Sequence, residues 1–418
     1  MKSFLVLSSL LLLFLEQPTP TRGLCGSTFL TFLPSSLSNM LSHTITTALN
    51  SNRGRKGGDL NEKLVLITGA NKGIGKEIAR LIGSTPGYCV LLACRNVALG
   101  VETANELRCQ PSPLEDFYDD EDDDNDDNDD YGEIYQQQQQ QQDRECNVIA
   151  LPYSLDLTNI QSIQTAAKYI QENYGPALDV LINNAAICYN DPTLYGKTSY
   201  TPFVQQAAPT IQTNYFGTKH VIDTFLPLLL QSNNSPRIIN MASYAGRLTI
   251  LDDQGENGKH LRNTFTSNSL TSNELSTLMS NFVTCVQSNT HIQAGWPSSC
   301  YGVSKLGIIA LTRVLAKQYP NIMSNSVDPG YCCTDQNNNR GTVSPVRGAR
   351  TAYLLALMER SYDDDDDDDD DNDRDNALEY DNDEVEEEED GDEVTESNHE
   401  AHSGLHFYEE SEISWTYD

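Results

Sequence analysis

The chain has 418 residues, and its formal net charge at pH 7 is −34. Two segments, 115–133 and 363–400, carry net charges of −13 and −23, so the remainder is close to neutral. A near-neutral remainder lacks the basic field of a nucleic-acid-binding protein. Ten cysteines without a CxxC pair argue against a metal site or a disulfide framework. The acidic segments have the composition of disordered insertions.

Residues 1–58 have the composition of a targeting leader. A lysine and then an apolar stretch from Phe4 to Leu15 indicate a secretory signal, which is too short for a membrane span. Residues 17–58 contain no acidic residue and are rich in Ser and Thr, as in transit peptides. Together they resemble the bipartite presequences of complex plastids. The alternatives are the endoplasmic reticulum or secretion, and we expect no stable membrane span in the mature chain.

Residues 59–362 alternate short apolar runs with segments of helical periodicity. An acidic and polyglutamine insert at 110–145 and a second insert at 251–299 interrupt this pattern. Alternating strands and helices predict an α/β fold, a Rossmann-type doubly wound parallel sheet in a single domain. The expected strands are 63–68, 88–94, 148–155, 178–182, 237–241 and 323–327, and the expected helices are 74–82, 97–107, 160–174, 202–230 and 301–319.

The C-terminal region divides into two parts. Residues 363–403 are expected to form an acidic disordered loop, and residues 404–418 contain a stretch with strand character, 405–415. We expect this stretch to close the sheet at its edge. The acidic run would then be a loop within the fold, which is tolerable because closure entropy grows only logarithmically with loop length.

A glycine-rich turn follows the first expected strand and opens the first helix. Glycines let the backbone approach a pyrophosphate, and a helix N-terminus favours an anion. Sites that hold NAD place an acidic residue after the second strand, but this chain has Arg95 there and Lys72 in the first turn. Two cations favour the 2′-phosphate of NADP. The predicted residues of the turn are Gly69, Asn71, Lys72, Gly73, Ile74 and Gly75.

Four later residues complete the candidate chemistry. Asn183 begins the polar sequence after the fourth strand, and Ser243 ends the fifth, where a hydroxyl can bond a carbonyl oxygen. Tyr301 and Lys305 are four residues apart and therefore share one helix face. A phenol has a reference pKa of about 10. We expect the neighbouring ammonium to lower the pKa of Tyr301, so that it can protonate an alkoxide.

This set of motifs resembles the short-chain dehydrogenase/reductase family, and within it the monomeric NADPH-dependent carbonyl reductases. The matching sequences are TGANKGIG, NNAA, TNYFGT and YGVSK. The resemblance implies a catalytic tetrad of Asn214, Ser243, Tyr301 and Lys305, the last two also holding the cofactor. It further implies cofactor contacts at Asp156, Leu157, Pro329, Gly330 and Thr334. Ala186 and Ala242 depart from the family pattern without removing a reacting group.

The expected activity is reduction of a small ketone, aldehyde or quinone by NADPH, with tyrosine as the proton donor. The alternatives are a dedicated biosynthetic ketoreductase or alcohol dehydrogenase, and a non-catalytic NADP-binding regulatory protein. The resemblance implies that the insert 251–299 covers the surface through which relatives dimerise. We therefore expect a monomer whose partner is a small-molecule carbonyl substrate.

Overall fold

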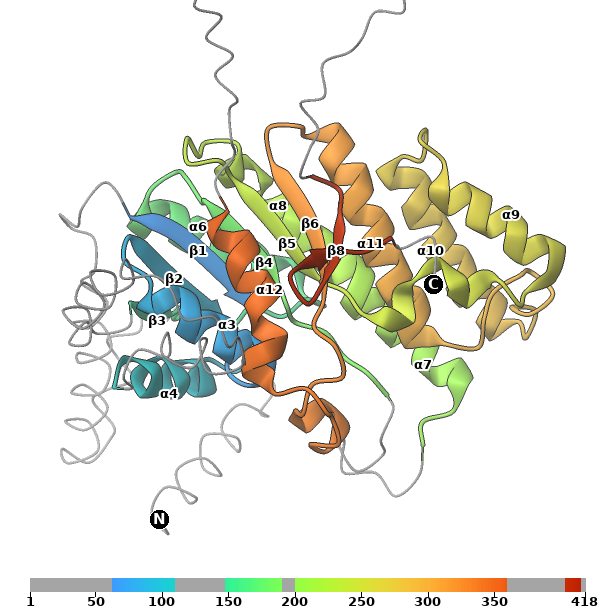
Figure 1. The fold of residues 1–418 in the computed structure, drawn as a ribbon, viewed down its shortest axis with the longest axis horizontal. Coiled ribbons are helices and arrows are strands. Elements are labelled where there is room, and N and C mark those ends of the chain that lie inside the picture. The colour runs from blue at the N-terminus through green and yellow to red at the C-terminus, as the bar shows by residue number, and fades with distance from the viewer. Residues whose placement is uncertain (1–61, 110–146, 190–199, 359–402, 415–418) are drawn as a thin grey trace, which may run out of the picture. The chain divides into compact units, whose positions relative to one another are not determined.

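The computed structural model describes residues 62–109, 147–189, 200–358 and 403–414 (Figure 1). All of them belong to one compact unit, Asp59–Asp418. The predicted leader, the insert 110–145 and nearly all of the acidic loop 363–403 lie outside the described residues. No helix among those that are described is long and apolar enough to cross a bilayer.

A single mixed sheet forms the centre of the domain. The strand order is β3-β2-β1-β4-β5-β6-β7-β8, and only β8 runs antiparallel to its neighbour. Chain order reverses between β1 and β4, where a doubly wound sheet opens a crevice at the carboxyl ends of its strands. The predicted fold class is confirmed. The strands are β1 Lys63–Thr68, β2 Tyr88–Ala93, β3 Val148–Ala150, β4 Val180–Asn183, β5 Arg237–Met241, β6 Met323–Asp328, β7 His406–Tyr408 and β8 Ser411–Glu412.

Helices cover both faces of this sheet (Figure 1). Successive residues of β1 show why: Leu64 and Leu66 enter one hydrophobic cluster, and Val65 and Ile67 enter the other. The first cluster is completed by α6 Ile160–Tyr174, α7 Phe203–Ile211, α8 Thr218–Leu229 and α11 Cys300–Gln318. The second is completed by α3 Gly73–Ser84, α4 Val97–Arg108 and α12 Pro345–Leu357.

Most of the expected strands and helices begin and end within two residues of their predicted bounds, but two differ more. β3 ends at Ala150 and not at residue 155; Pro152, which has no N–H to donate, follows shortly. The helix expected over 202–230 is interrupted by a π-helical turn, η4 Gln212–Gly217, just after a proline inside α7. A π-turn of this kind marks functional sites in many helices. Here it carries Asn214, one of the predicted catalytic residues.

The insert 251–299 is helical despite its many Ser, Thr and Asn residues. It contains α9 Gly255–Thr266 and α10 Ser272–Gln287. Thr271 and Glu274 form a reciprocal capping box that starts α10. Trp296 is fully buried between the rings of Phe265 and Phe282. α10 packs against α7 and α11, so the insert extends the domain on the side of these helices (Figure 1).

The C-terminal strand joins the sheet beyond β6. β7 pairs in parallel with β6, with His406 opposite Ser326. The His406 side chain is buried, and its Nδ1 lies 2.9 Å from the Ser326 hydroxyl. Glu409 and Glu410 then turn the chain into the two-residue strand β8. Strands that precede the acidic segment in the sequence and strands that follow it thus belong to one sheet.

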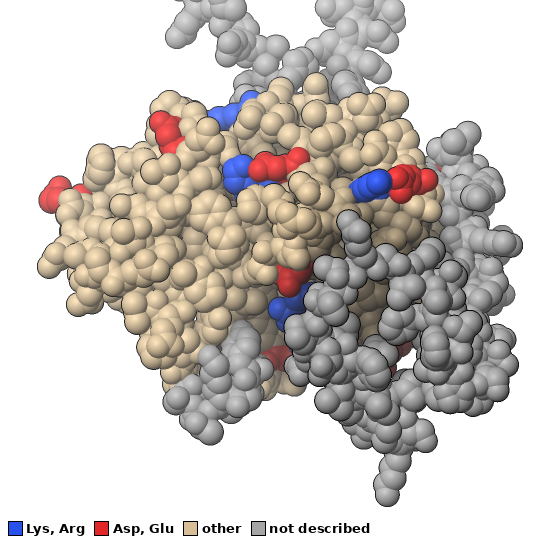
Figure 2. Space-filling view, turned by 180° about the vertical axis from the view of Figure 1, so that it is seen from behind, with Lys and Arg blue, Asp and Glu red and all other residues tan. Residues whose placement is uncertain are grey.

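Charges on the surface are mixed. On the face shown in Figure 2, basic side chains of the described part lie mostly beside acidic ones and do not merge into a basic field. Lys259–Glu256 and Lys168–Glu172 are examples of exposed ion pairs in which a basic side chain lies beside an acidic one. That surface is the one expected from the near-neutral remainder of the sequence.

Candidate active site

Tyr301 and Lys305 lie on the first turns of α11, beside the carboxyl end of β5. Ser299 caps the helix by accepting the Gly302 N–H. Lys305 is buried, and its Nζ donates to the carbonyl oxygen of Met241 at 2.6 Å. The same Nζ lies 5.6 Å from the centre of the Tyr301 ring. The helix therefore holds an amine and a phenol side by side at the edge where ligands bind.

Ser243 connects the end of β5 to this helix. Its hydroxyl accepts the Ala245 N–H at 3.3 Å, which caps a short 3₁₀ turn, Tyr244–Gly246. The same hydroxyl hydrogen-bonds the Tyr301 side chain. Gly246 allows the 3₁₀ turn to approach α11 closely, because a Cβ at this position would lie 2.6 Å from the Lys305 carbonyl carbon. Ser243 is both a turn former and a neighbour of the phenol.

Asn214 links the π-turn to the segment after β4. Its Oδ1 accepts the Ile187 N–H at 2.8 Å, and its Nδ2 donates to the Ile187 carbonyl oxygen at 2.9 Å. Nδ2 also donates to Ser304 Oγ at 3.0 Å, and Ser304 donates to the Tyr301 carbonyl oxygen. Asn214 is thus joined through Ser304 to the backbone of Tyr301. The Lys305 ammonium lies beside the Tyr301 ring without a hydrogen bond to the other three predicted catalytic residues.

Burial dominates the electrostatics of Tyr301. The residue is partly exposed, but desolvation of the phenol raises its pKa. Cys188 and Asp328 raise this pKa further, whereas the hydrogen bond with Ser243 lowers it. The expected lowering of the Tyr301 pKa by Lys305 is therefore wrong, because the pKa of this phenol is raised. Burial also lowers the pKa of Lys305, to about 8, against the opposing effects of Cys188 and Asp328.

The glycine turn has the shape that the sequence predicts. Gly69 and Gly73 have φ values of +67° and +57°, which favour glycine. A Cβ at Gly75 would lie 2.4 Å from Asn184 Nδ2. The Asn71 carbonyl oxygen is held by Thr103 Oγ1 at 3.0 Å, and Ile74 packs against the core.

Cations flank this turn. Lys72 and Arg95 are exposed, and Lys72 Nζ pairs with Asp335 Oδ2 at 3.1 Å. Thr334 lies against Gly73, where a Cβ would be 3.4 Å from its methyl group. The loop after β6 therefore reaches the glycine turn.

The remaining predicted cofactor residues lie along the same edge, with different degrees of access. Asp156 is partly buried, and its Oδ1 accepts both the N–H and the hydroxyl of Thr158. Leu157 is buried against the π-turn at Gly217. The Asn183 side chain is buried and donates to Asn240 Oδ1 at 2.9 Å. Pro329 and Gly330 begin the loop after β6, Gly330 with φ of +75°.

Sequence reasoning missed two groups at this edge. Thr68 Oγ1 accepts the N–H groups of Asn184 and Ala185, both at 3.1 Å, which fixes the segment beside the glycine turn. Asp328 adds a carboxylate that interacts with Lys305 and with the guanidinium of Arg247. The position of Asp328 at the carboxyl end of a strand, directly before Pro329-Gly330, was the available signal. Within the described ranges, no cluster of His, Cys, Asp and Glu could hold a metal ion.

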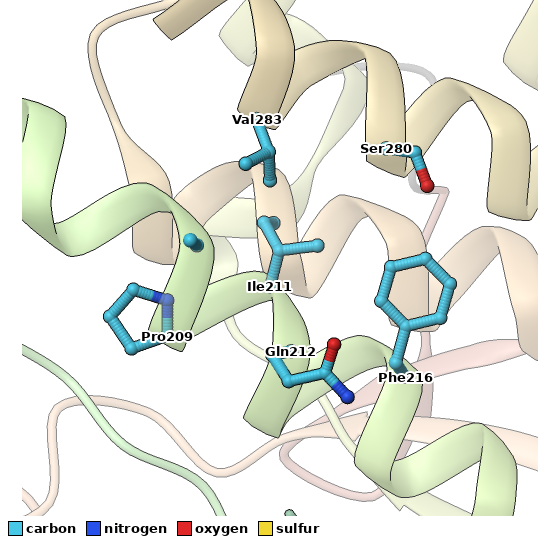
Figure 3. A pocket seen from close by; sticks show the side chains of 7 residues that line it. Pro209, Ile211, Gln212, Phe216, Ser280 and Val283 are labelled. Carbon is cyan, nitrogen blue, oxygen red and sulfur yellow. The ribbon is translucent and has the colours of Figure 1, made fainter. Parts of the chain in front are cut away.

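A hollow of about 450 Å³ lies elsewhere, between α10 and the α7–π-turn junction (Figure 3). Ile211, Phe216 and Val283 make its lining largely apolar. None of the predicted catalytic or cofactor residues lines it. We therefore do not assign the substrate to this hollow.

Comparison with known proteins shows the family to which the chain is related. The family model described as short chain dehydrogenase matches residues 125–251. Carbonyl reductase (NADPH) 3 of Rattus norvegicus is 31% identical over 304 residues, which cover 71% of this chain and 91% of that protein. Carbonyl reductase (NADPH) 1 of Homo sapiens is 30% identical over 303 residues, with the same coverage.

Solved structures give the same picture. Salutaridine reductase from Papaver somniferum has a TM-score of 0.52 and 26% identity, and covers 71% of this chain and 96% of its own. Menthone neomenthol reductase from Mentha piperita has a TM-score of 0.52 and 25% identity, covering 71% and 94%. The chain belongs to the short-chain dehydrogenase family and is an oxidoreductase that resembles its carbonyl reductases.

Proposed function

We propose that this protein reduces the carbonyl group of a small ketone, aldehyde or quinone to an alcohol, with NADPH as the reductant. The observation that carries the proposal is the convergence of Ser243 and Lys305 on Tyr301 at the carboxyl edge of the sheet. Asn214 joins them through Ser304. This is a proton donor with an oxygen-orienting hydroxyl and a cation beside it.

The residues present fit a dinucleotide. Lys72, the N-cap of α3, makes no side-chain capping bond, so the first-turn N–H groups are available to a phosphate. A Cβ at Gly75 would displace Asn184 from the Thr68 and Gly69 carbonyl oxygens that it bonds. The glycine turn and Thr334 would hold the pyrophosphate side, and Lys72 and Arg95 the 2′-phosphate. When bound, the dinucleotide supplies the hydride for the carbonyl carbon.

The side chains of the cluster have separable tasks. Ser243 donates a hydrogen bond to the substrate oxygen and stabilises the charge that develops on it. Tyr301 donates its phenolic proton to that oxygen; the raised pKa keeps the phenol protonated, which is the state that reduction requires. Lys305 places a cation beside the phenol and would hold the nicotinamide ribose. Asn214 fixes the segment after β4 against α11.

Two other functions use the same scaffold. A dedicated biosynthetic ketoreductase or alcohol dehydrogenase would act on one substrate class only. A regulatory protein would bind NADP without turnover, but the presence of Ser243 and Lys305 beside Tyr301 favours an enzyme.

The test is oxidation of NADPH and of NADH against a panel of ketones, aldehydes and quinones. We expect turnover with several carbonyl compounds and a preference for NADPH. Activity on one compound alone would favour the dedicated enzyme, and binding of NADPH without turnover of any compound would favour the regulatory protein. In Arg95→Glu, the affinity for NADPH should fall by roughly tenfold or more, because a charge-assisted bond to the phosphate is lost.

The matched control for Arg95 is Lys76→Ala, which removes a cation of α3 that pairs with Glu106. It should leave the ratio of NADPH to NADH affinities unchanged. Equal loss of both dinucleotides in Arg95→Glu would contradict a 2′-phosphate site.

We also propose a monomer. α10 lies on α7 and α11, the surface that the resemblance implies for dimerisation in relatives. Sedimentation velocity should give the mass of one chain at all concentrations tested. A concentration-dependent shift to twice that mass would show that another surface of the protein associates.

A further inference from the structure

Asp328 is a buried carboxylate that the proposed mechanism does not use. It is the last residue of β6 and is 3% exposed. Its Oδ1 accepts the Gly330 N–H at 3.0 Å, and the carboxylate also accepts the Tyr244 backbone N–H. These two bonds tie the end of β6 to the 3₁₀ turn that follows Ser243. Burial raises the pKa of Asp328, and these backbone donors oppose that rise because they favour the ionised carboxylate.

The strand register brings this carboxylate to Lys305. Met241 of β5, whose carbonyl oxygen accepts the Lys305 ammonium, is the cross-strand partner of Val327. Asp328 follows Val327 directly, so it stands at the adjoining strand end. The two side chains act on each other: Asp328 favours the charged form of Lys305, and Lys305 favours the charged form of Asp328.

Other titratable or charged groups surround this pair. Lys305 is also influenced by Cys188, which contributes a negative charge only when its thiol ionises. Several segments around Asp328 contribute groups that interact with it electrostatically: Arg247 after the 3₁₀ turn, Tyr301 and Lys305 of α11, Cys332 of the following loop, and Tyr408 of β7. Asp328 therefore faces two cations.

We propose that Asp328 is a positioning residue of this site, whose carboxylate is the counter-charge that keeps the buried Lys305 ammonium charged and held at the end of β5. Burial alone favours the neutral amine, because the charged form loses its hydration. An opposite charge nearby restores the ammonium. The inference rests on the proposed role of Lys305, but it concerns the charge of that residue and not the reaction.

The sign of the expected change follows from these interactions. Burial lowers the pKa of Lys305 to about 8, and Asp328 opposes that fall. Without the carboxylate charge, the pKa of Lys305 drops further, and the amine becomes neutral at a lower pH. Turnover that needs the ammonium is then lost at a lower pH as well.

The test is Asp328→Asn, which keeps an acceptor for Gly330 and Tyr244 but removes the charge. The Lys305 titration is followed by nitrogen NMR in lysine-labelled protein without cofactor or substrate. Its resonance is the one missing from Lys305→Met. We expect the midpoint to fall by roughly one pH unit or more, and the alkaline limb of kcat to move by a similar amount. An unchanged midpoint overturns the proposal.

Two further variants separate charge from structure. Asp179→Asn alters another buried carboxylate, which accepts the Leu64 N–H and the Ser232 hydroxyl beside the amino end of β4. It should lower stability without moving the Lys305 midpoint. Asp328→Glu keeps the charge and should keep the midpoint near that of the wild type. If Asp328→Asn does not fold, Asp328→Ser takes its place, and the Lys305 midpoint is expected to fall by the same amount.

The measurement on ligand-free protein also separates this inference from the proposed function. A chain that reduces no carbonyl compound, but whose Lys305 midpoint falls in Asp328→Asn, would refute the reductase and retain the counter-charge. A chain that reduces carbonyl compounds, but whose Lys305 midpoint does not move in Asp328→Asn, would retain the reductase and refute the counter-charge.

Discussion

Replacing Tyr301 with phenylalanine is expected to lower kcat for carbonyl reduction by roughly 10³-fold or more, while NADPH still binds. The ring remains, so its packing on α11 is preserved, but the substrate oxygen loses its proton donor. Because the phenol contributes to the chemical step, the loss should fall on kcat. Stopped-flow turnover and fluorescence titration of NADPH measure the two quantities separately.

Tyr319→Phe is the matched control, since this tyrosine ends the same helix and its hydroxyl accepts a bond from Gln318. It should leave kcat unchanged. If Tyr301→Phe turns over at the wild-type rate, then another group donates the proton and the assignment of Tyr301 fails.

The second large effect is expected from Lys305→Met, which keeps the length of the side chain and removes its charge. We expect kcat/KM to fall by roughly 10³-fold, since both the cation beside the phenol and a contact to the ribose are lost. The pKa of Lys305 is lowered by burial to about 8 from its ordinary value of 10.5. The ammonium is therefore present below about pH 8 and is lost above it. Wild-type turnover should decline through that range.

The pH–rate profile of Lys305→Met should lack this decline, because the variant has no amine to titrate. Lys317→Met is the control: this lysine of α11 is exposed and bonds Asn268. A decline near pH 8 that persists in Lys305→Met would assign the decline to another group.

Local patterns were sufficient for the fold, and they also indicated Ser243, Tyr301 and Lys305 as candidate catalytic residues, whereas Asn214 followed only from the family resemblance. Lys63–Thr68 and Arg237–Met241 have the predicted bounds, because buried parallel strands are short apolar runs with sharp ends. Tyr301 and Lys305 follow from helical spacing alone. The glycines at positive φ follow from the turn that joins a strand to a helix.

Properties that depend on contacts through space were not predictable in this way. Spacing brought Lys305 beside Tyr301, but it could not show that burial raises the pKa of the phenol. The Asn214 side chain in the π-turn makes two hydrogen bonds to the backbone of Ile187, which is 27 residues away in the chain. The approach of Asp328 to Lys305 depends on the register of β5 and β6.

β7 has a consequence for how this chain behaves when shortened. It saturates the outer backbone groups of β6, and beyond it lies a two-residue strand that follows two glutamates. A chain that ends after α12 would present β6 with one side bare, a template on which strands of other copies can assemble. The short charged hairpin therefore protects against aggregation. A premature stop codon within residues 363–403 would therefore lower the solubility of the protein, although all the proposed catalytic residues would still be present.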